Sequence, residues 1–405
     1  PGVLLQETDK SFITPGVDPS GMAIIGPTAK GPVNSPTRVT NYQEFKDIFG
    51  TTIRNGSYRE ELYTNLAVKN YFANGGSSVL VVRAVNGSFT TASNTPIEAS
   101  DAGAAPFTLA TLGEGEALNS SADENTDPVE FANSTAYESG SRDNLKWEIN
   151  NVNISNGTFT LVIRRGDDTN KQPIVLESFP EISLDPNHPN YIVKAVGDQY
   201  QAAAIDGETG DYLMTNFGEF PNRSRFIRVA TVDRPTIRYR GADGNVRVDA
   251  SDNSFSGSLP ATDQSGGFGG AIGDVLSATP ANNQFGQYAG TTVDNIQGLT
   301  TASYDIPISL LKNKDEFSFK TLIAPGLNVS ASKTTLDTII ENTTLRGDSF
   351  FVLDTVPYSS SISIADATTQ SNLLDTSFAA TYWPWVQVFS SELARNVSFC
   401  SSVKL

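Results

Sequence analysis

The sequence contains very few of the side chains that most often carry catalytic chemistry. Its 405 residues include one histidine, His188, and one cysteine, Cys400. Such a chain cannot build an ordinary Ser-His-Asp or Cys-His site unless His188 itself serves, and it cannot build a zinc cluster. It also lacks a Gly-x-Ser-x-Gly elbow and a Gly-Lys-Ser/Thr phosphate loop. We therefore expect no enzyme activity, and we assign no catalytic residue, no metal ligand and no cofactor.

Three weaker patterns leave other chemistry open. The glycine-rich run Gly266–Gly273 looks like a dinucleotide loop, but Ile272 stands where the third glycine belongs when counted from Gly267. The acidic run Asp123–Asp127 could hold Ca²⁺, but it matches no twelve-residue calcium loop, so a solvated acidic face is the better interpretation. Any two of the 45 acidic residues could form the carboxylate pair of a hydrolase, since the sequence does not say which of them meet in space.

Positive charge and long apolar runs are scarce as well. With 28 lysines and arginines against 45 acidic residues the formal net charge is −17, which argues against nucleic acid or an anionic membrane as the main partner. Seven arginines gather between Arg223 and Arg247, and we expect them to pair with acidic surface of the same or an adjacent copy. No apolar run approaches the roughly 20 residues of a membrane span. A lone cysteine fits a reducing compartment, and we expect Cys400 to be an inert structural residue.

The amino-terminal region begins with a strand and a helix. Met22–Ile25 is a short apolar run that stops at Gly26, which is typical of a strand buried on both faces. Further along, Asn41 can cap a helix, because Glu44 follows at the spacing of a capping box. We expect this helix to end at Gly50.

The alternation of helix and strand continues after that helix and returns near the other end of the chain. A helix is predicted over residues 59–72, and a strand follows over 78–85. Further elements are predicted late in the chain: a strand over 310–326, a helix over 334–343, a strand over 349–356 and a helix that includes Leu373, Leu374 and Phe378. This alternation indicates an α/β layer with right-handed crossovers.

The middle of the chain has a different character. Residues 84–141 contain nine carboxylates and no lysine or arginine. Short β-prone runs separated by Asn-Gly and Gly-Asp turns follow over 146–200, and residues 251–301 are rich in glycine, serine, asparagine and threonine. The simplest account is one α/β core made by both ends of the chain and interrupted by residues 94–302.

Several segments, taken in order, resemble contractile-tail sheath proteins of tailed bacteriophages. They share the spacing of turn residues, strands and aromatic helix ends that this family shows. The segments are Gly21–Gly50, with a strand ending in Gly-Pro and a helix ending in Phe-Gly; Phe72–Gly76 followed by Val81–Val85; Glu177–Val196, with its Ser-Leu-Asp-Pro; Leu310–Gly326, with its Leu-Ile-Ala-Pro-Gly; and Tyr382–Val386, similar to the family's Tyr-Tyr-Pro-Trp.

The resemblance and the residue patterns together imply a multidomain α+β protein. Its α/β core is discontinuous, because it comes from both ends of the chain, and a large β-rich region is inserted in it. The expected divisions are an extended N-terminal arm (1–20), the sheath core (21–93 plus 303–405) and the surface-exposed insertion (94–302), made of an acidic subdomain (94–142) and a β subdomain (143–302).

The resemblance also implies a structural function. Such a subunit polymerises around a tail tube and contracts to drive the tube through the host envelope. The expected partners are other copies of the chain in stacked rings or a helical lattice, the tail tube protein, and the baseplate and tail terminator proteins. Neither nucleic acid nor membrane is an expected direct partner. The expected location is the virion tail, after assembly in the cytoplasm of the bacterial host.

The N-terminal arm has strand character but no sheet of its own. Prolines and a glycine separate its β-prone run from the core. One interpretation is that the run pairs within its own subunit. The resemblance favours another, in which it crosses to a neighbouring subunit and adds a strand to a sheet there. The residues expected to exchange in this way are Val3, Leu4, Leu5, Gln6 and Glu7.

Two other classes of protein compete with this interpretation. A β-rich surface adhesin or carbohydrate-binding virion protein would account for the polar insertion but not for the α/β segments on either side of it. A hydrolase would need a carboxylate pair in a cleft. Sheath proteins also continue beyond the Trp-Pro-Trp region with a helical segment and a strand that contacts the tube, whereas this chain ends at Leu405, so we assign no tube-facing residue.

Overall fold

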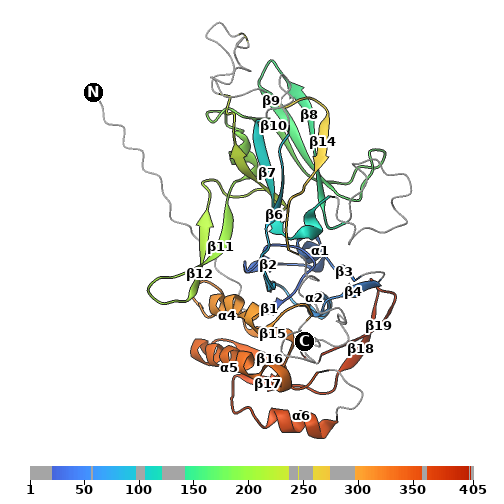
Figure 1. The fold of residues 1–405 in the computed structure, drawn as a ribbon, viewed down its shortest axis with the longest axis vertical. Helices are drawn as coiled ribbons and strands as arrows, with labels where there is room; N and C mark the ends of the chain where they lie inside the picture. Colours follow the sequence, from blue (N-terminus) through green and yellow to red (C-terminus); the bar gives the residue numbers. More distant parts are fainter. Residues whose placement is uncertain are drawn as a thin grey trace.

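A six-stranded sheet lies at the centre of the computed structural model (Figure 1). The structure describes residues 21–55, 58–96, 105–120, 142–236, 245, 259–273, 297–357, 363–400 and 402. The order of the strands is β17-β16-β15-β1-β5-β2, and all neighbours are parallel except β2 and β5. The strands are β1 (Met22–Gly26), β2 (Thr37–Val39), β5 (Val79–Arg83), β15 (Thr321–Asn328), β16 (Phe350–Asp354) and β17 (Ala379–Thr381).

Strand β1 is buried on both faces, which confirms the prediction for Met22–Ile25. Successive side chains of a strand point to opposite faces of the sheet. Ala23 and Ile25 accordingly belong to one apolar cluster, whereas Met22 and Ile24 belong to another. The strand pairs with β5 on one side and with β15 on the other. Strands from distant parts of the chain therefore meet at β1.

Helices cover both faces of this sheet. On the side of Met22 and Ile24 the apolar cluster includes residues of α1 (Tyr42–Phe49) and α2 (Tyr63–Ala73). The other cluster includes residues of two further helices, and a shorter helix lies beyond them (Figure 1). These are α4 (Asp305–Leu311), α5 (Val329–Arg346) and α6 (Ile364–Ser371). The unit thus has three layers, with the sheet between two layers of helices.

The beginning of α1 confirms Asn41 as its cap. The Asn41 side chain accepts a hydrogen bond from the backbone N–H of Glu44 at 2.8 Å. The Glu44 carboxylate accepts one from the backbone N–H of Thr40, also at 2.8 Å, so the reciprocal bond reaches one residue further back than in a standard capping box. The helix ends at Gly50, as predicted, with φ of 71° at that residue.

The region between β5 and α4 consists mainly of antiparallel sheets, drawn in the upper half of Figure 1. Two of these sheets share one apolar cluster, in which Phe107 and Phe159 stack. The first contains β8 (Leu145–Asn153), β9 (Thr158–Arg165), β10 (Val175–Ser183) and β14 (Gln264–Gly267), and the second contains β6 (Thr91–Asn94), β7 (Phe107–Glu114) and β13 (Ile227–Val232). A short helix, α3 (Ile192–Val196), and the 3-10 turn η1 (Glu116–Leu118) complete this region.

Three two-stranded sheets lie at the margins of these two parts. They are β3 (Thr52–Asn55) with β4 (Tyr58–Glu61), β11 (Tyr200–Ile205) with β12 (Tyr212–Phe217), and β18 (Val386–Ser390) with β19 (Arg395–Phe399). The remaining element is the 3-10 turn η4 (Thr301–Tyr304), which leads into α4. Among the described helices, none combines the length and the hydropathy that crossing a membrane requires.

The prediction of a helix that includes Leu373, Leu374 and Phe378 is wrong. The helix in this region, α6, begins after Ser363 and ends at Ser371. Ser363 and Asp366 form a reciprocal capping box that fixes the earlier start. The spacing of the apolar residues resembled a helical face, but the local capping hydrogen bonds decide where the helix lies.

The central position of β1 predicts a large loss of stability for Ile24→Ala. We expect about 2 to 5 kcal/mol, because the substitution removes buried carbons and leaves a cavity. Ile24 is fully buried, whereas Ile364 at the start of α6 is 69% exposed. Ile364→Ala is therefore the control, with an expected change below about 0.5 kcal/mol. Urea unfolding followed by tryptophan fluorescence measures both, and equal effects would contradict the assignment.

Candidate functional site

The most deeply buried charged contact lies where the six-stranded sheet meets the antiparallel region. Arg83, the last residue of β5, is 1% exposed. Its Nη1 donates hydrogen bonds to the backbone carbonyl oxygens of Gly31, at 2.6 Å, and Glu114, at 2.7 Å. Gly31 lies in the turn after β1, and Glu114 is the last residue of β7. One guanidinium group therefore ties the central sheet to the antiparallel region.

Backbone contacts reinforce the same connection. The N–H of Glu114 donates to the carbonyl oxygen of Gly31 at 3.1 Å, and the Glu114 carboxylate accepts from the N–H of Val33 at 2.9 Å. The two chain segments approach closely because both carry glycine here. A Cβ added to Gly113 would lie 3.1 Å from the Cα of Gly31, and Gly31 itself has φ of 109°, which favours glycine.

A second tie is made by Lys30. Its side chain is almost completely buried, and its ammonium group donates to the carbonyl oxygen of Asp143 at 3.1 Å. The Asp143 carboxylate lies 3.8 Å from the same nitrogen. Lys30, Gly31, Arg83, Glu114 and Asp143 together are named the joint.

Burial perturbs the charged groups of the joint. It lowers the pKa of Arg83 to about 10, an effect that the Glu114 carboxylate opposes, so Arg83 stays a cation at neutral pH. Burial raises the pKa of Glu114, against the hydrogen bond from Val33 and the charge of Arg83. Burial also lowers the pKa of Lys30, against the charge of Asp143. Such buried charges are retained only where hydrogen bonds compensate them, so the joint tolerates little change in geometry.

Two cavities open at the joint, and Lys30 and Asp143 line both. The larger, of about 440 Å³, extends from the turn after β1 to Tyr200 and Asn216 of the β11–β12 hairpin. The smaller, of about 250 Å³, lies between α1 and the beginning of β8. The joint is therefore packed at its centre and hollow on two sides.

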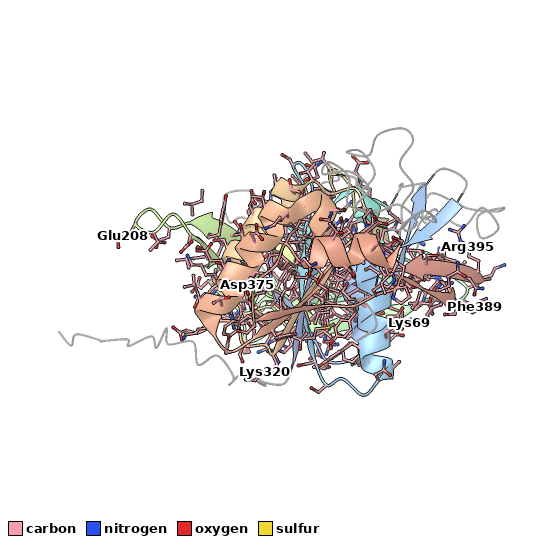
Figure 2. All side chains as sticks on the ribbon, turned by 90° about the horizontal axis from the view of Figure 1, so that it is seen from below. Lys69, Glu208, Lys320, Asp375, Phe389 and Arg395 are labelled. Atoms are coloured by element: carbon pink, nitrogen blue, oxygen red, sulfur yellow. The ribbon has the colours of Figure 1, made fainter. Side chains whose placement is uncertain are left out.

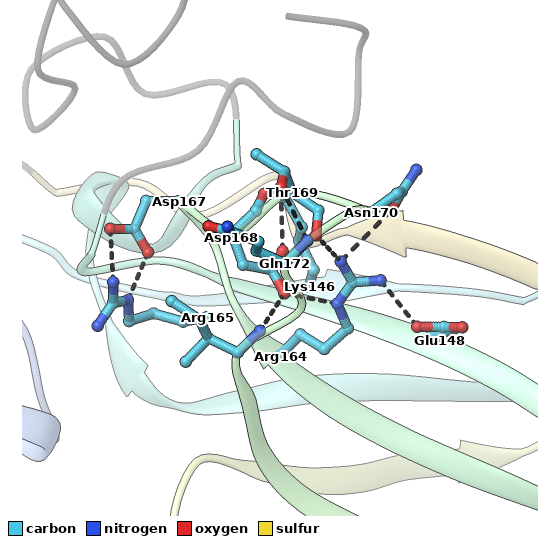
Figure 3. A network of polar contacts seen from close by, with 10 residues as sticks. Lys146, Glu148, Arg164, Arg165, Asp167, Asp168, Thr169, Asn170 and Gln172 are labelled. Atoms are coloured by element: carbon cyan, nitrogen blue, oxygen red, sulfur yellow. Dashed lines mark hydrogen bonds and ion pairs between the residues drawn. The ribbon is translucent and has the colours of Figure 1, made fainter.

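A second polar network lies within the antiparallel region (Figure 3). Arg164 donates from Nε to the Asp168 carboxylate at 2.6 Å and from Nη1 to the Glu148 carboxylate at 2.8 Å. Lys146 donates to the backbone oxygen of Asp168 at 2.8 Å, and the N–H of Ile174 donates to the Asp168 carboxylate at 2.8 Å. Because each carboxylate here is held by cations or N–H groups, the network fixes the loop after β9 and offers no free carboxylate pair for hydrolysis.

The edge of the central sheet where doubly wound folds usually bind ligands is occupied by the chain itself. Ligands in such folds lie outside the carboxyl ends of the strands where the strand order reverses, here between β1 and β15. At this edge the Gln297 side chain accepts from the N–H of Tyr63 at 2.8 Å. Ser402 donates from its N–H, at 3.0 Å, and its hydroxyl, at 2.6 Å, to the Asp354 carboxylate. Cys400 is fully buried beside them, and burial raises its pKa, as expected of a structural thiol.

The structure places the sequence-derived candidates as follows. His188 lies in a turn, where its Nδ1 accepts from the N–H of Asn190 at 3.1 Å. The start of Gly266–Gly273 belongs to β14, which pairs antiparallel with β8, so it is not the strand-to-helix turn of a dinucleotide site. Within the described residues, no group of three histidines, cysteines or acids is placed to hold a metal ion.

Other candidates lie outside the described residues. These are the arm residues Val3–Glu7 and the acidic run Asp123–Asp127. The pairing of the arginines between Arg223 and Arg247 with acidic surface stays a prediction.

The joint itself was missed by the sequence analysis. Arg83 was assigned to a strand and Glu114 to an acidic face. One signal was available, because a charged residue directly follows the wholly apolar run Val79–Val82. A cation at the end of a central strand needs a partner, but the sequence does not name it.

Comparison with solved structures finds two proteins of partly similar fold. A crystal structure of a sheath tail protein from Listeria innocua has a TM-score of 0.40 and 9% identity, over 84% of this chain and 49% of that one. A crystal structure of a sheath tail protein from Desulfitobacterium hafniense has a TM-score of 0.35 and 10% identity, over 100% of this chain and 60% of that one. The chain thus covers less than two thirds of either protein. Both names agree with the resemblance found in the sequence.

Comparison with models of protein families and with curated proteins finds no match.

Arg83→Met tests the importance of the joint. The substitution removes the donor shared by two buried carbonyl groups and the charge beside Glu114, so we expect a loss of about 3 to 5 kcal/mol in the free energy of unfolding. Arg223→Met, at an exposed arginine, is the matched control and should change stability by less than about 0.5 kcal/mol. Chemical denaturation measures both. A loss for Arg83→Met as small as that of the control would show that the guanidinium group is dispensable.

The raised pKa of Glu114 predicts a dependence of stability on pH. The folded protein binds this proton more readily than the unfolded chain, so the contribution of Glu114 is fully present below its ordinary pKa of 4.5 and is lost as pH rises through the folded-state pKa. In Glu114→Gln this loss is absent. The stability of the variant relative to the unsubstituted protein should therefore increase as pH rises from about 4.5, whereas Glu341→Gln, on the exposed side of α5, should show no such trend. A difference that does not vary with pH would contradict the prediction.

Proposed function

We propose that this chain is a subunit of the contractile tail sheath of a bacteriophage. Copies of it would polymerise around a tail tube in stacked rings or a helical lattice. Contraction of this lattice would drive the tube through the host envelope. The proposed location is the virion tail, after assembly in the host cytoplasm, and the tail tube, baseplate and tail terminator proteins are the proposed partners.

One observation carries this proposal. The sequence segments that resemble sheath proteins are far apart in the chain, yet three of them contribute central strands to one sheet. Gly21–Gly50 contains β1, Phe72–Val85 contains β5, and Leu310–Gly326 contains most of β15, and these three strands are neighbours. Segments matched to one family by sequence alone would have no reason to form adjacent strands unless they belong to one functional unit.

The proposed division of the chain follows from the same arrangement. Residues 21–93 and 303–405 form a discontinuous sheath core, and residues 94–302 form a β-rich insertion on its outside. Residues 1–20 form an arm. The core carries the contacts that build the lattice, and the insertion decorates its surface.

The proposed mechanism needs rigid subunits. Contraction converts one lattice into another of lower free energy, and the subunits rotate as whole bodies while their terminal arms stay paired. A packed three-layer core and the buried joint support this mechanism, because both resist bending within the subunit. The work is stored in the assembled lattice, so no nucleotide and no catalytic residue takes part.

The arm supplies the proposed link between subunits. Residues Val3–Glu7 add a strand to a sheet of a neighbouring copy, where main-chain hydrogen bonds supply adhesion. Within the described residues, β18 and β19 pair only with each other. A two-stranded sheet of this kind leaves an edge on each side for a further strand.

Electron microscopy of negatively stained, complete protein tests the proposal. We expect rings or tubes from the unsubstituted protein and none from Leu5→Pro, because proline in the arm removes a donor and disrupts strand pairing. Leu5→Val keeps a strand-forming side chain and should still assemble. Monomers that persist at high concentration in all three proteins would contradict the sheath function, and glycan binding by those monomers would favour a carbohydrate-binding virion protein.

A further inference from the structure

The β11–β12 hairpin projects from the body of the molecule and ends in an acidic turn. Figure 2 shows Glu208 at the tip, on the opposite side of the molecule from Phe389 and Arg395. Near the turn the hairpin is fastened to α4, because the N–H of Tyr212 donates to the Ser309 hydroxyl at 2.9 Å. The adjacent ion pair between Asp211 and Lys312, also at 2.9 Å, holds the same side. The tip is therefore a presented structure with a defined direction.

The turn itself is ordered by its own hydrogen bonds. The Asp206 carboxylate accepts from the N–H of Glu208 at 3.1 Å and from the Thr209 hydroxyl at 2.8 Å. These hydrogen bonds lower the pKa of Asp206, so it stays charged. The Glu208 carboxylate is exposed and has no ion-pair partner among the described residues. Beside it, the apolar side chain of Ile205 is 62% exposed.

The cavity of about 250 Å³ beside α1 has the opposite character. The formal net charge of the chain is −17, yet the cavity collects more cations than carboxylates. The charged residues that line it are Lys30, Lys46, Arg142, Arg165, Asp47 and Asp143. Lys30 and Arg165 are paired, with Asp143 and Asp167.

Two cations of this cavity remain available. Lys46 lies over the ring of Tyr42, 5.4 Å from its centre, and Arg142 is exposed. Neither has a carboxylate partner among the residues that the structure describes. Leu176 and Phe226 add apolar surface to the same cavity. The cavity therefore offers what the hairpin tip lacks: positive charge beside apolar side chains.

The two surfaces cannot meet within one molecule, because the hairpin tip and α1 lie on different sides of it (Figure 1). They can meet between copies. We propose that the tip of the β11–β12 hairpin of one copy docks in the cavity beside α1 of a second copy, with Glu208 against Arg142 and Lys46 and with Ile205 against the apolar lining. This contact is head-to-tail, and repeated contacts of this type generate rings or helical arrays. The inference rests on the proposed function, since it names two surfaces through which sheath subunits touch.

Charge reversal and its rescue test the contact in the complete protein. Glu208→Lys and Arg142→Glu each replace an attraction by a repulsion, so each should weaken self-association about tenfold in sedimentation velocity. The double variant restores opposite charges and should return to within about threefold of the unsubstituted protein. Raising the salt concentration should weaken the association of the unsubstituted protein, because salt screens exposed charges. Glu341→Lys on α5 makes the same change in net charge away from both surfaces and should have no effect.

The outcomes separate this inference from the proposed function. Tubes that form normally in both single variants would overturn the docking contact and leave the sheath function standing. Failure of the double variant to recover would also overturn the contact, because a nonspecific charge effect or local misfolding would then explain the single variants. An unsubstituted protein that does not associate at all would count against both.

Discussion

The hydrogen bonds of β1 with its two neighbours hold the architecture together. On one side β1 pairs with β5, and on the other with β15, which lies about three quarters of the way along the chain. Closing so long a loop costs little more than closing a short one, because the entropic cost grows only with the logarithm of length, by about 0.6 kcal/mol per doubling. A large antiparallel region can therefore stand between β5 and β15 without disrupting the sheet. The burial of β1 on both faces then fixes its register and brings the helices of both layers together.

The joint determines how that antiparallel region is carried. A purely apolar contact between the two parts would allow many similar packings, whereas Arg83 must find two particular carbonyl oxygens and Glu114 a particular N–H group. Buried groups of this kind are costly when unpaired, so few alternative geometries are tolerated. The occupied carboxyl edge of the sheet acts in the same direction, since Gln297 and Ser402 fill a place where related architectures hold ligands. Both features favour a rigid building block over a ligand-binding molecule.

The sequence was most informative where local chemistry decides the structure. The apolar run at Met22 predicted a doubly buried strand, and Asn41 predicted a helix cap, because each signal lies within a few residues of its effect. The joint could not be predicted, since Val33 and Glu114 are separated by 81 positions and meet only after the sheets have formed. Local signals also misled where two competed, as at α6, where a capping box outweighed the apolar spacing of Leu373 and Leu374. The proposed exchange of Val3–Glu7 depends on a second molecule, which no single chain can reveal.

Native-state hydrogen exchange tests the central claim most directly, because it measures which segments open together. If β1 joins distant parts of the chain in one cooperative sheet, the amides of Met22–Gly26 and of the paired residues Thr321–Ile323 should exchange with the same free energy of opening. That shared value should be among the highest in the molecule. Exchange of β1 at a clearly lower free energy than β15 would contradict the account, since the two strands would then belong to separate folding units.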